Sequence, residues 1–464
     1  MTLEHAARAA HAEILRPAEV TLTGAASDNR TVRPGQLFVA IPGEKTDGHL
    51  FAAAAVQAGA SAVLAEHDPF AGKPPVPVLL VQNSVKALGL IAHDWRSSFQ
   101  GKVVGLTGTA GKTTTKELLS SILSCRGKTA RTALNLNTQV GMPVSMLEAD
   151  GDESFWVMEA GISRPDDMDE LGPILEPDLA VILNAGTGHS LGLGKKGTAY
   201  YKSKLLNYLK KGGIALVSAD YEDLVSEAKA LRPDTIFFSA FGRKAPYRAE
   251  YLGLDENGCS RCRLYLDGES FDVTCALSGA YAAENVLAAA ATAHLLGLSR
   301  QEIIQGLEGA SLPAQRFARH ETGGWSVIDD SYNANPLSAG RMIEAAAELA
   351  GGRPFLCVMG AMAELGDKAE DEHRKLGQKL AASGCQAVFW TGEHAAEVQE
   401  GLETGAFSGH YAAFSGPEDF SAALEEWRAA YPHVLAGLAL FKGSRRNRME
   451  RFVKLFMERV CHAV

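Results

Sequence analysis

The sequence lacks the features that mark several large classes of protein. No uninterrupted apolar stretch approaches the ~20 residues that a helix needs to cross a bilayer. Residues 1–15 carry charges among their alanines, unlike a secretory signal peptide. Basic residues are not in excess, because 45 Lys and Arg stand against 55 Asp and Glu, a formal net charge of −10. This balance argues against general binding to nucleic acids or membrane surfaces. We therefore expect a soluble, cytoplasmic protein with no nucleic-acid partner and no membrane insertion.

Cysteine is also scarce, and the seven cysteines follow no regular framework. Cys259 and Cys262 have the spacing of half a zinc site and Cys275 is nearby, but no second pair follows. The segment after Asn257-Gly258 alternates like a β-hairpin. We therefore expect reduced thiols, and metal binding at this segment is the weaker interpretation.

The chain has 464 residues, which at a prior of ~150 residues per domain corresponds to about three domains. Apolar residues make up 46% and charged residues 22%, as in a globular protein with a large core. We place the domains at residues 1–100, 101–312 and 313–464.

All three domains alternate strands and helices, which predicts an α/β fold. The smaller N-terminal α/β domain has short strands ended by Pro and Gly, at 37–41, 61–64 and 78–81. The central domain has apolar runs that are typical of buried parallel strands, at 155–158, 179–183 and 214–217. This pattern predicts a doubly wound, P-loop ATPase-like sheet, with a more antiparallel patch at 247–277. The third domain repeats the alternation and is expected to be Rossmann-like.

The most informative segment is a glycine-rich turn between a strand and a helix. Its residues are Thr107, Gly108, Thr109, Ala110, Gly111, Lys112, Thr113 and Thr114. In such a loop, backbone N–H groups and the helix N-terminus hold phosphate oxygens, the lysine reaches the outer phosphates and the next hydroxyl ligates magnesium. Leu106 stands where the strict nucleotide motif has its first glycine. The segment therefore predicts a phosphate-binding loop and leaves its purpose open.

Polar residues follow the neighbouring strands. Glu159 directly follows one apolar run and His189 follows the next, and Lys202 and Lys204 come early in the helix beyond. Ligands of parallel sheets bind at this carboxyl edge. Thr, Glu and His beside phosphate and water make an oxygen-rich magnesium site. Each residue alone is more often structural, but their joint position beside one phosphate loop favours a metal–nucleotide site.

The third domain adds two polar segments at strand ends. One is the run Asp329-Asp330-Ser331-Tyr332-Asn333-Ala334-Asn335-Pro336, and the other is Lys442-Gly443-Ser444-Arg445. The alternative to a binding role is an Asx-rich turn for the first segment and a solvated basic loop for the second.

Together these motifs resemble those of the Mur ligases, ATP-dependent enzymes that add amino acids to UDP-N-acetylmuramic acid. The resemblance spans all three domains and covers essentially the whole chain. The segments that carry it are 27–30, 47–49, 107–114, 135–143, 159–161, His189, Lys204, Asn285, 329–336, 362–366, 442–445 and 449–450.

The resemblance implies roles for these residues. It assigns the uridine-diphosphate end of the substrate to Ser27, Asp28 and Arg30. It assigns ATP to the loop from Thr107 to Thr113 and to Asn285, Arg316 and Asp330. Further substrate contacts are implied for His49, Asn137, Thr138, Asn333, Asn335, Lys442, Ser444 and Arg445.

The resemblance also implies magnesium and a modified lysine as cofactors. Thr113 and Glu159 would hold one magnesium ion and His189 a second. Lys204, rather than Lys202, matches the family lysine that carbon dioxide converts to a carbamate, an anionic oxygen ligand. The catalytic residues would then be Lys112, Glu159, His189 and Lys204.

The family reaction is phosphoryl transfer to a carboxylate, followed by displacement of phosphate by an amine. The 329–336 and 442–445 segments point to the members that join D-alanyl-D-alanine to UDP-N-acetylmuramoyl-tripeptide in cytoplasmic peptidoglycan precursor synthesis. We expect these two small molecules as partners, a monomeric enzyme, and closure of the third domain onto ATP.

The sequence departs from the family pattern in places, and two alternatives stay open. Tyr281 replaces a histidine and Ala282 an asparagine of the adenine motif, while Ala361, Thr138 and Gln315 depart elsewhere. One alternative is another amino acid ligase of the same superfamily, such as the folylpolyglutamate or diaminopimelate-adding type. The other is a nucleotide-binding protein without ligase activity, which the changed adenine motif alone supports.

Overall fold

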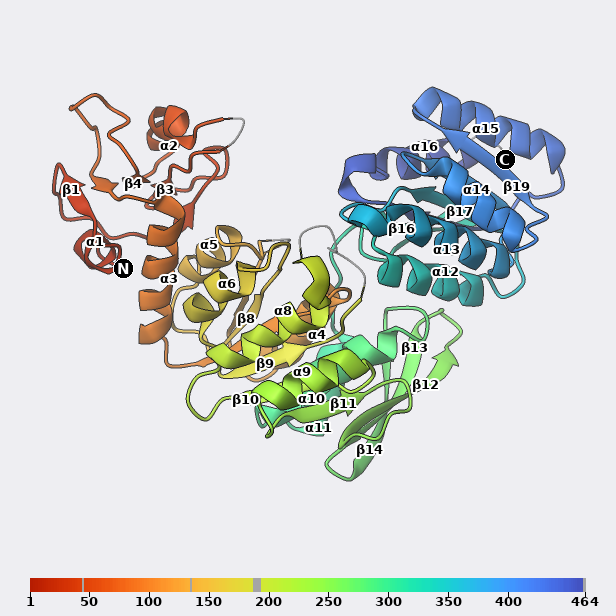
Figure 1. The fold of residues 1–464 in the computed structure, drawn as a ribbon, viewed down its shortest axis with the longest axis horizontal. Helices are drawn as coiled ribbons and strands as arrows, with labels where there is room; N and C mark the ends of the chain where they lie inside the picture. The colour runs from red at the N-terminus through yellow and green to blue at the C-terminus, as the bar shows by residue number, and fades with distance from the viewer. Residues whose placement is uncertain (44–45, 134–135, 187–192, 462–464) are drawn as a thin grey trace.

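The chain folds into three α/β units, each built around its own sheet. The structure, a computed structural model, describes residues 1–43, 46–133, 136–186 and 193–461. The sheets have five, nine and six strands in chain order. Figure 1 shows the N-terminal unit (red to orange) and the C-terminal unit (blue) on opposite sides of the central unit (yellow to green). The three-domain α/β fold predicted from the sequence is confirmed.

The N-terminal unit has short strands and one long helix. Its elements are α1 (Leu3–Ala9), β1 (Glu13–Leu15), β2 (Ala25–Ala26), β3 (Leu37–Val39), η1 (Gly48–Phe51), α2 (Ala52–Gln57), β4 (Ala62–Ala65), β5 (Val78–Leu80) and α3 (Ser84–Ser98). The strand order is β1-β5-β4-β3-β2, parallel except for β1. Helix α3 leads to the central unit, where the buried Arg96 forms a 2.9 Å ion pair with Asp178.

The central unit contains the largest sheet. Its strands are β6 (Lys102–Thr107), β7 (Thr129–Arg131), β8 (Phe155–Glu159), β9 (Leu179–Ile182), β10 (Ile214–Ser218), β11 (Ile236–Ser239), β12 (Tyr247–Leu254), β13 (Ser260–Leu266) and β14 (Glu269–Cys275). The order is β14-β13-β12-β11-β10-β9-β6-β8-β7, and β12, β13 and β14 pair antiparallel while the other neighbours are parallel. The predicted antiparallel patch at 247–277 is therefore present.

Helices cover both faces of this sheet. They are α4 (Lys112–Ser124), α5 (Gly141–Leu147), α6 (Asp167–Leu175), η2 (Gly194–Lys196), α8 (Gly197–Ser203), η3 (Lys204–Tyr208), α9 (Glu222–Leu231), α10 (Ala282–Leu295) and α11 (Arg300–Glu308). Strands β8 and β9 are buried along their whole length, as their continuous apolar runs require. Nearly every residue of α10 is also buried, because its small alanine side chains let it pack closely against α4.

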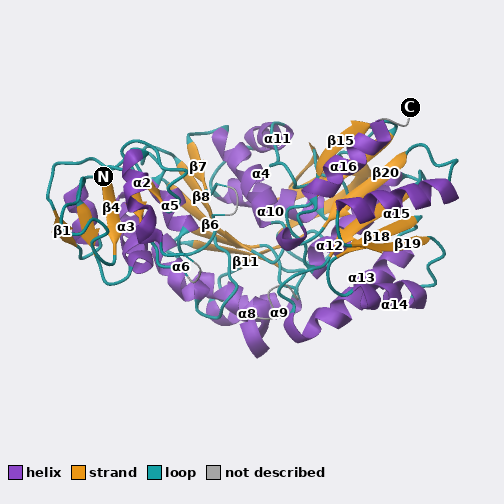
Figure 2. Ribbon diagram, turned by 90° about the horizontal axis from the view of Figure 1, so that it is seen from above, coloured by secondary structure: helices purple, strands orange, loops and turns teal. Residues whose placement is uncertain are grey.

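The C-terminal unit is a second, six-stranded α/β layer structure. Its elements are β15 (Ala318–Thr322), β16 (Trp325–Asp330), α12 (Pro336–Ala350), β17 (Phe355–Gly360), η4 (Gly366–Lys368), α13 (Ala369–Ala382), β18 (Ala387–Thr391), α14 (Ala395–Thr404), β19 (His410–Phe414), α15 (Pro417–Ala430), β20 (Gly437–Lys442), η5 (Arg445–Asn447) and α16 (Glu450–Cys461). The order is β15-β16-β20-β17-β18-β19, parallel except for β15. Figure 2 shows α15 and α16 on one face and α13 and α14 on the other, each packed on its own apolar cluster.

These elements place the site at the carboxyl ends of the strands. β6, β8 and β9 of the central unit end at the phosphate loop, Glu159 and Asn184, and β16 and β20 of the C-terminal unit end at Asp330 and Lys442. Among the described residues, no helix is long and apolar enough to cross a membrane. The domain limits at 100/101 and 312/313 stay predictions.

Candidate nucleotide-binding and catalytic site

The phosphate loop lies between β6 and α4, in the position predicted. Gly111 precedes α4 with φ +78°, a left-handed conformation that glycine adopts without strain. A Cβ atom at this position would lie 2.2 Å from Asn285 Oδ1. Backbone conformation and space therefore both require glycine. Lys112 Nζ donates a 2.8 Å hydrogen bond to the Gly108 carbonyl, which keeps the ammonium group at the loop.

Asn184, just after β9, holds the shape of the loop. Its Oδ1 atom accepts hydrogen bonds from the backbone N–H groups of Thr109 and Ala110, each at 2.8 Å. Its Nδ2 atom donates to the Ala110 carbonyl at 3.0 Å. The side chain thus binds both polar groups of Ala110 and fixes the turn.

Thr113 and Glu159 present a hydroxyl and a carboxylate beside the loop. Both are buried, and Thr113 Oγ1 donates a 3.1 Å hydrogen bond to Glu159 Oε2. Asn137 Nδ2 donates a 2.7 Å hydrogen bond to the other carboxylate oxygen and orients it. Oxygen donors of this kind are the ligands that magnesium prefers, so these residues fit the ion.

The C-terminal unit closes the other side of the same cleft. The cavity between the two units has a volume of about 260 Å³. From the central unit its lining includes the loop from Thr109 to Thr114, Asn137, Glu159 and Asn285. From the C-terminal unit it includes Arg316, Asp330, Tyr332, Asn333, Asn335 and Lys442.

Three contacts hold the residues that the C-terminal unit contributes to the cleft. Asn335 caps α12, and its Nδ2 atom donates a 3.2 Å hydrogen bond to the Thr109 carbonyl of the loop. The Arg316 guanidinium lies 4.1 Å from the centre of the Tyr332 ring. Lys442 is buried and forms an ion pair with Asp330.

Two lysines of the cleft are wholly or partly removed from solvent, because Lys442 is buried and Lys112 is half-buried. Burial lowers the pKa of Lys112, against the opposing effect of Glu159, and Arg316 lowers it further. Burial likewise lowers the pKa of Lys442, although Asp330 opposes the change. A buried cation of this kind is stabilised by a nearby anion. The cleft therefore suits a polyanionic ligand such as a nucleoside triphosphate.

Apolar and aromatic side chains line another part of the cleft. Tyr281 and Phe317 lie with ring centres 6.3 Å apart. Asn285 accepts a 3.2 Å hydrogen bond from Thr115, and its buried Nδ2 atom has no partner within the described part of the chain. An aromatic wall and a free amide donor are what a flat heterocyclic base requires. Gln315, where the family pattern has glycine, has φ +63° and is strained by it.

Comparisons with known proteins agree with this geometry. Residues 21–96 match the family model described as the Mur ligase family, catalytic domain, and residues 106–293 match the Mur ligase middle domain. Residues 315–445 match the Mur ligase, glutamate ligase domain. The UDP-N-acetylmuramoyl-tripeptide–D-alanyl-D-alanine ligase of Escherichia coli (strain K12) is 30% identical over 447 residues, 96% of each chain. The chain belongs to the Mur ligase family.

Solved structures agree with this assignment. The chain is similar to MurF from Acinetobacter baumannii with a TM-score of 0.87 at 29% identity, covering 98% of both chains. It is also similar to the MurF ligase from Thermotoga maritima in complex with ADP, with a TM-score of 0.80 at 28% identity, covering 95% of this chain and 98% of that one. The protein is therefore an ATP-dependent Mur-type ligase.

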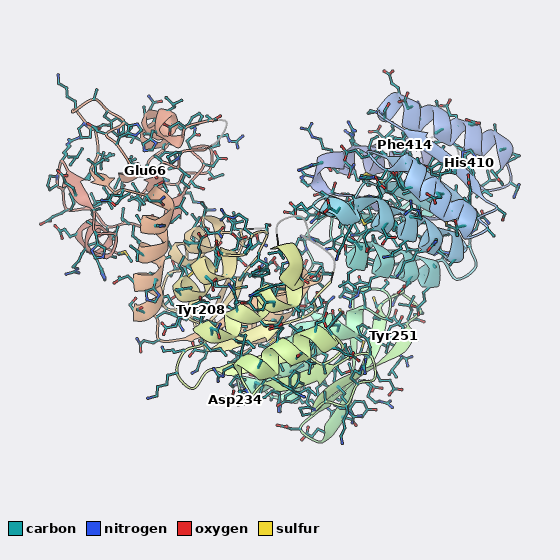
Figure 3. All side chains as sticks on the ribbon, in the orientation of Figure 1. Glu66, Tyr208, Asp234, Tyr251, His410 and Phe414 are labelled. Atoms are coloured by element: carbon teal, nitrogen blue, oxygen red, sulfur yellow. The ribbon has the colours of Figure 1, made fainter. Side chains whose placement is uncertain are left out.

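The structure does not support the prediction that Lys204 is the modified lysine of this Mur ligase. Lys204 forms an ion pair with Asp169, and Tyr208, labelled in Figure 3, donates a 2.7 Å hydrogen bond to the same carboxylate. Lys202 instead is 1% exposed. Burial lowers the pKa of Lys202 well below its ordinary value, Lys112 lowers it further, and Glu159 opposes the change. The identity of the modified lysine stays a prediction, and the burial of Lys202 makes it a second candidate for that role.

The other predicted catalytic residues divide into two groups. Lys112 and Glu159 lie together at the cleft, as predicted. His189, expected to serve a second magnesium ion, lies outside the described residues, so its role stays a prediction.

The predicted uridine-binding residues are in the N-terminal unit, away from the cleft. Arg30 forms a two-point ion pair with Asp28, with distances of 2.9 and 2.6 Å, and Ser27 beside them is exposed. His49 is buried, its Nδ1 atom lies 2.6 Å from Asp47, and its Nε2 atom accepts a hydrogen bond from the Glu66 N–H. Because both ring nitrogens are engaged, His49 positions its loop (Glu66 is labelled in Figure 3).

Three further predicted substrate residues are not part of the cleft lining among the described residues. Thr138 accepts a hydrogen bond at 3.2 Å from the N–H of Gly141, the first residue of α5. Ser444 donates to Asn447 at 2.7 Å, and Arg445 to Glu450 at 3.0 Å. Their substrate contacts stay predictions.

Sequence reasoning missed three residues of the cleft and its support. Asn184 could have been predicted as Glu159 was, because it is also a polar residue that follows a buried strand. Arg341 lines the cleft and pairs with the buried Glu284 at 2.8 Å. The only sequence signal for Glu284 was a charged residue in an alanine-rich helix.

Proposed function

We propose that this Mur ligase joins D-alanyl-D-alanine to UDP-N-acetylmuramoyl-tripeptide in cytoplasmic peptidoglycan precursor synthesis. Relatives that carry this activity in their names align with nearly the whole chain. The observation that carries the proposal is that Asn333, Asn335 and Lys442 share one cleft with Thr113 and Glu159. Residues from both of the segments that distinguish this branch of the family therefore line the same cleft as the phosphate loop.

ATP is held by the phosphate loop in this proposal. The carboxylate of the tripeptide attacks the γ-phosphate, so that a new O–P bond forms while the bond to ADP breaks. The amine of the dipeptide then forms the C–N bond, loses a proton, and phosphate leaves. Lys112 and Arg316 are placed to neutralise charge on the transferring group. Asn285 and the Tyr281–Phe317 wall would bind the adenine, which their position in the cleft lining supports.

Thr113 and Glu159 are the residues that would hold magnesium. When bound, the ion neutralises negative charge on the phosphate oxygens. Asn137 would keep the Glu159 carboxylate in its orientation through the 2.7 Å hydrogen bond. His189 is proposed for a second ion from the resemblance alone.

Lys202 is the lysine that we propose as the carbamate site. The chain buries its side chain, and the charges of Lys112 and Glu159 both act on the pKa of its amine. A neutral lysine amine can attack carbon dioxide: an N–C bond forms as one C–O π bond opens onto oxygen, the nitrogen loses a proton to water, and the side chain becomes an anionic carbamate. An anion at this position would offset the cost of burying the side chain next to the Lys112 cation. It would also add an oxygen ligand near Glu159.

The remaining substrate groups are assigned by unit. The uridine-diphosphate end would bind Ser27, Asp28 and Arg30 of the N-terminal unit. The dipeptide would bind the C-terminal unit near Asn333 and Asn335. Thr138, Ser444 and Arg445 are proposed as outer contacts of the bound substrates.

Phosphate release tests the proposal against its sibling activities. The purified protein is given ATP, magnesium and UDP-N-acetylmuramoyl-tripeptide, and then either D-alanyl-D-alanine or a single amino acid. We expect sustained phosphate release when the dipeptide is the acceptor, and none when a single amino acid takes its place. Release that needs glutamate or diaminopimelate instead would assign the protein to a different branch, and release without any acceptor would make it an ATPase.

A further inference from the structure

A buried carboxylate, Glu284, connects the C-terminal unit to the phosphate loop. Glu284 lies in the first turn of α10 and has no exposed surface. Its Oε2 atom accepts hydrogen bonds from Arg341 Nη1 at 2.8 Å and from Asn184 Nδ2 at 2.7 Å. Arg341 belongs to α12 of the C-terminal unit, whereas Asn184 holds the loop of the central unit. One carboxylate oxygen therefore joins the two.

The second carboxylate oxygen fixes the position of the arginine. Glu284 Oε1 accepts a 2.9 Å hydrogen bond from the Tyr221 hydroxyl, and Arg341 Nη2 donates a 2.8 Å hydrogen bond to that hydroxyl. The guanidinium is thereby held at two points, and its side chain is 10% exposed. A displacement of α12 would break both contacts and leave the Glu284 charge buried without a cation.

Glu284 also determines the orientation of the Asn184 amide. Asn184 uses its two N–H donors on Glu284 and the Ala110 carbonyl, and its oxygen accepts from the N–H groups of Thr109 and Ala110. The reversed amide would place donors against donors and oxygen against oxygen. The carboxylate thus favours the one orientation in which the loop is held in its present shape.

Helix α12 reaches the same loop by a second, direct contact. Asn335 at its N-terminus donates a hydrogen bond to the Thr109 carbonyl at 3.2 Å. The position of α12 therefore affects the loop by two routes. Asn335 contacts Thr109 directly. Arg341 acts on Thr109 and Ala110 through Glu284 and Asn184. Two independent contacts from one helix converge on two adjacent loop residues.

We propose that Glu284 is a positioning residue that couples the docking of α12 to the shape of the phosphate loop. Nucleotide binding and docking of the C-terminal unit then strengthen each other, because such coupling is reciprocal. The inference rests on the proposed function only in that a nucleotide binds the loop. It adds a specific connection by which the unit that contributes Lys442 and Asn333 is aligned when the nucleotide is present.

The test measures the affinity for ADP, in the presence of magnesium, by calorimetry. It compares the unmodified 464-residue protein with its variants. The variants are Glu284→Gln, Arg341→Met and the double variant. Arg96→Met is the matched control, because Arg96 also forms a largely buried ion pair between units (side chains 1% and 16% exposed, against 10% and 0% for Arg341 and Glu284). Arg96 donates to Asp178 and to the carbonyls of residues 175 and 176, none of which lines the cleft. A purely structural role for Glu284 would lower thermal stability, as Arg96→Met does, and leave the ADP affinity of the folded protein unchanged.

We expect Glu284→Gln and Arg341→Met each to weaken ADP binding by between about 5-fold and 150-fold. The double variant should be no weaker than Glu284→Gln, since both changes interrupt one connection. Hydrogen exchange measures the coupling in the opposite direction. ADP should slow the exchange of backbone amides in α12 of the unmodified protein, but not in α12 of the Arg341→Met variant. If Glu284→Gln does not fold, Arg341→Met alone tests the proposal. Unchanged ADP affinity in the variants, or fully additive losses, would overturn the coupling. Failure of the unmodified protein to bind ADP would instead contradict the proposed function.

Discussion

The Thr113 hydroxyl donates a 3.1 Å hydrogen bond to Glu159, so the first turn of α4 and the end of β8 present their oxygen atoms at one point. Replacing Thr113 by valine keeps the shape and removes the oxygen. We expect the rate of phosphate release to fall by between about 10-fold and 100-fold, as for other changes next to a metal ion. The magnesium concentration needed for half-maximal rate should rise.

Thr113→Ser is the control for this prediction, because it keeps the hydroxyl. It should stay close to the unmodified rate. A valine variant with an unchanged rate and magnesium dependence would remove Thr113 from the metal site.

The two neighbouring lysines provide a matched pair of variants. Lys202→Ala removes the buried amine that we propose as the carbamate site, and we expect ligation to be lost. Acetate or formate should restore part of the activity by supplying the missing carboxylate. Lys204→Ala removes the ion pair with Asp169, which as a partly exposed pair is worth at most about 1 kcal/mol, and cation–π contacts with Tyr200 and Tyr201.

Both lysine variants are assayed for ligation with and without added acetate. The assignment predicts loss and rescue for position 202 and near-normal activity for position 204. The reverse result would return the modified lysine to Lys204.

Gly111→Ala tests whether the close approach of Asn285 matters for the loop. Gly111 has φ +78° and its added Cβ would meet Asn285 at 2.2 Å, whereas Gly212 has the same φ and nothing within 4 Å. Both variants carry the cost of a left-handed alanine, about 1–2 kcal/mol. Only Gly111→Ala should also weaken ADP binding, by at least about 10-fold. Equal ADP affinity in the two variants would contradict the crowded contact at the loop.

Glu302 provides a prediction on pH. Hydrogen bonds, first from the Arg126 side chain and then from Ser299, lower the pKa of Glu302 from 4.5 to about 2. Because the folded pKa is below the unfolded one, the carboxylate contributes stability that is complete above pH 4.5 and is lost as the pH falls toward 2. Glu302→Gln should therefore reduce the pH dependence of the unfolding free energy in this range. Urea unfolding at several pH values measures this pH dependence, with Glu308→Gln on the same helix as the control. Identical pH profiles of the unfolding free energy for Glu302→Gln and the unmodified protein would contradict the prediction.

Much of the fold followed from local patterns. The apolar runs that became β8 and β9 are buried on both faces, and burial of this kind leaves a continuous signal in the sequence. The phosphate loop and Glu159 were also predictable, because each depends on a short segment at a strand end.

The remaining features depend on geometry that a local pattern does not contain. Lys202 and Lys204 lie two residues apart, which in a helix turns their side chains by about 200°. A motif match cannot determine which of them faces the loop, since α8 ends at Ser203 and a tighter 3₁₀ turn begins at Lys204. The contact of Glu284 with Arg341 joins residues of different units, and no sequence periodicity connects them.

The fate of one oxygen atom tests the proposed reaction most directly. UDP-N-acetylmuramoyl-tripeptide labelled with heavy oxygen in its terminal carboxylate is incubated with the protein, ATP, magnesium and D-alanyl-D-alanine, and the products are analysed by mass spectrometry. We predict a pentapeptide product, with heavy oxygen transferred to the released phosphate, because phosphate leaves with a carboxylate oxygen. Released phosphate without the label, or no pentapeptide in the presence of the dipeptide, would contradict the proposed function.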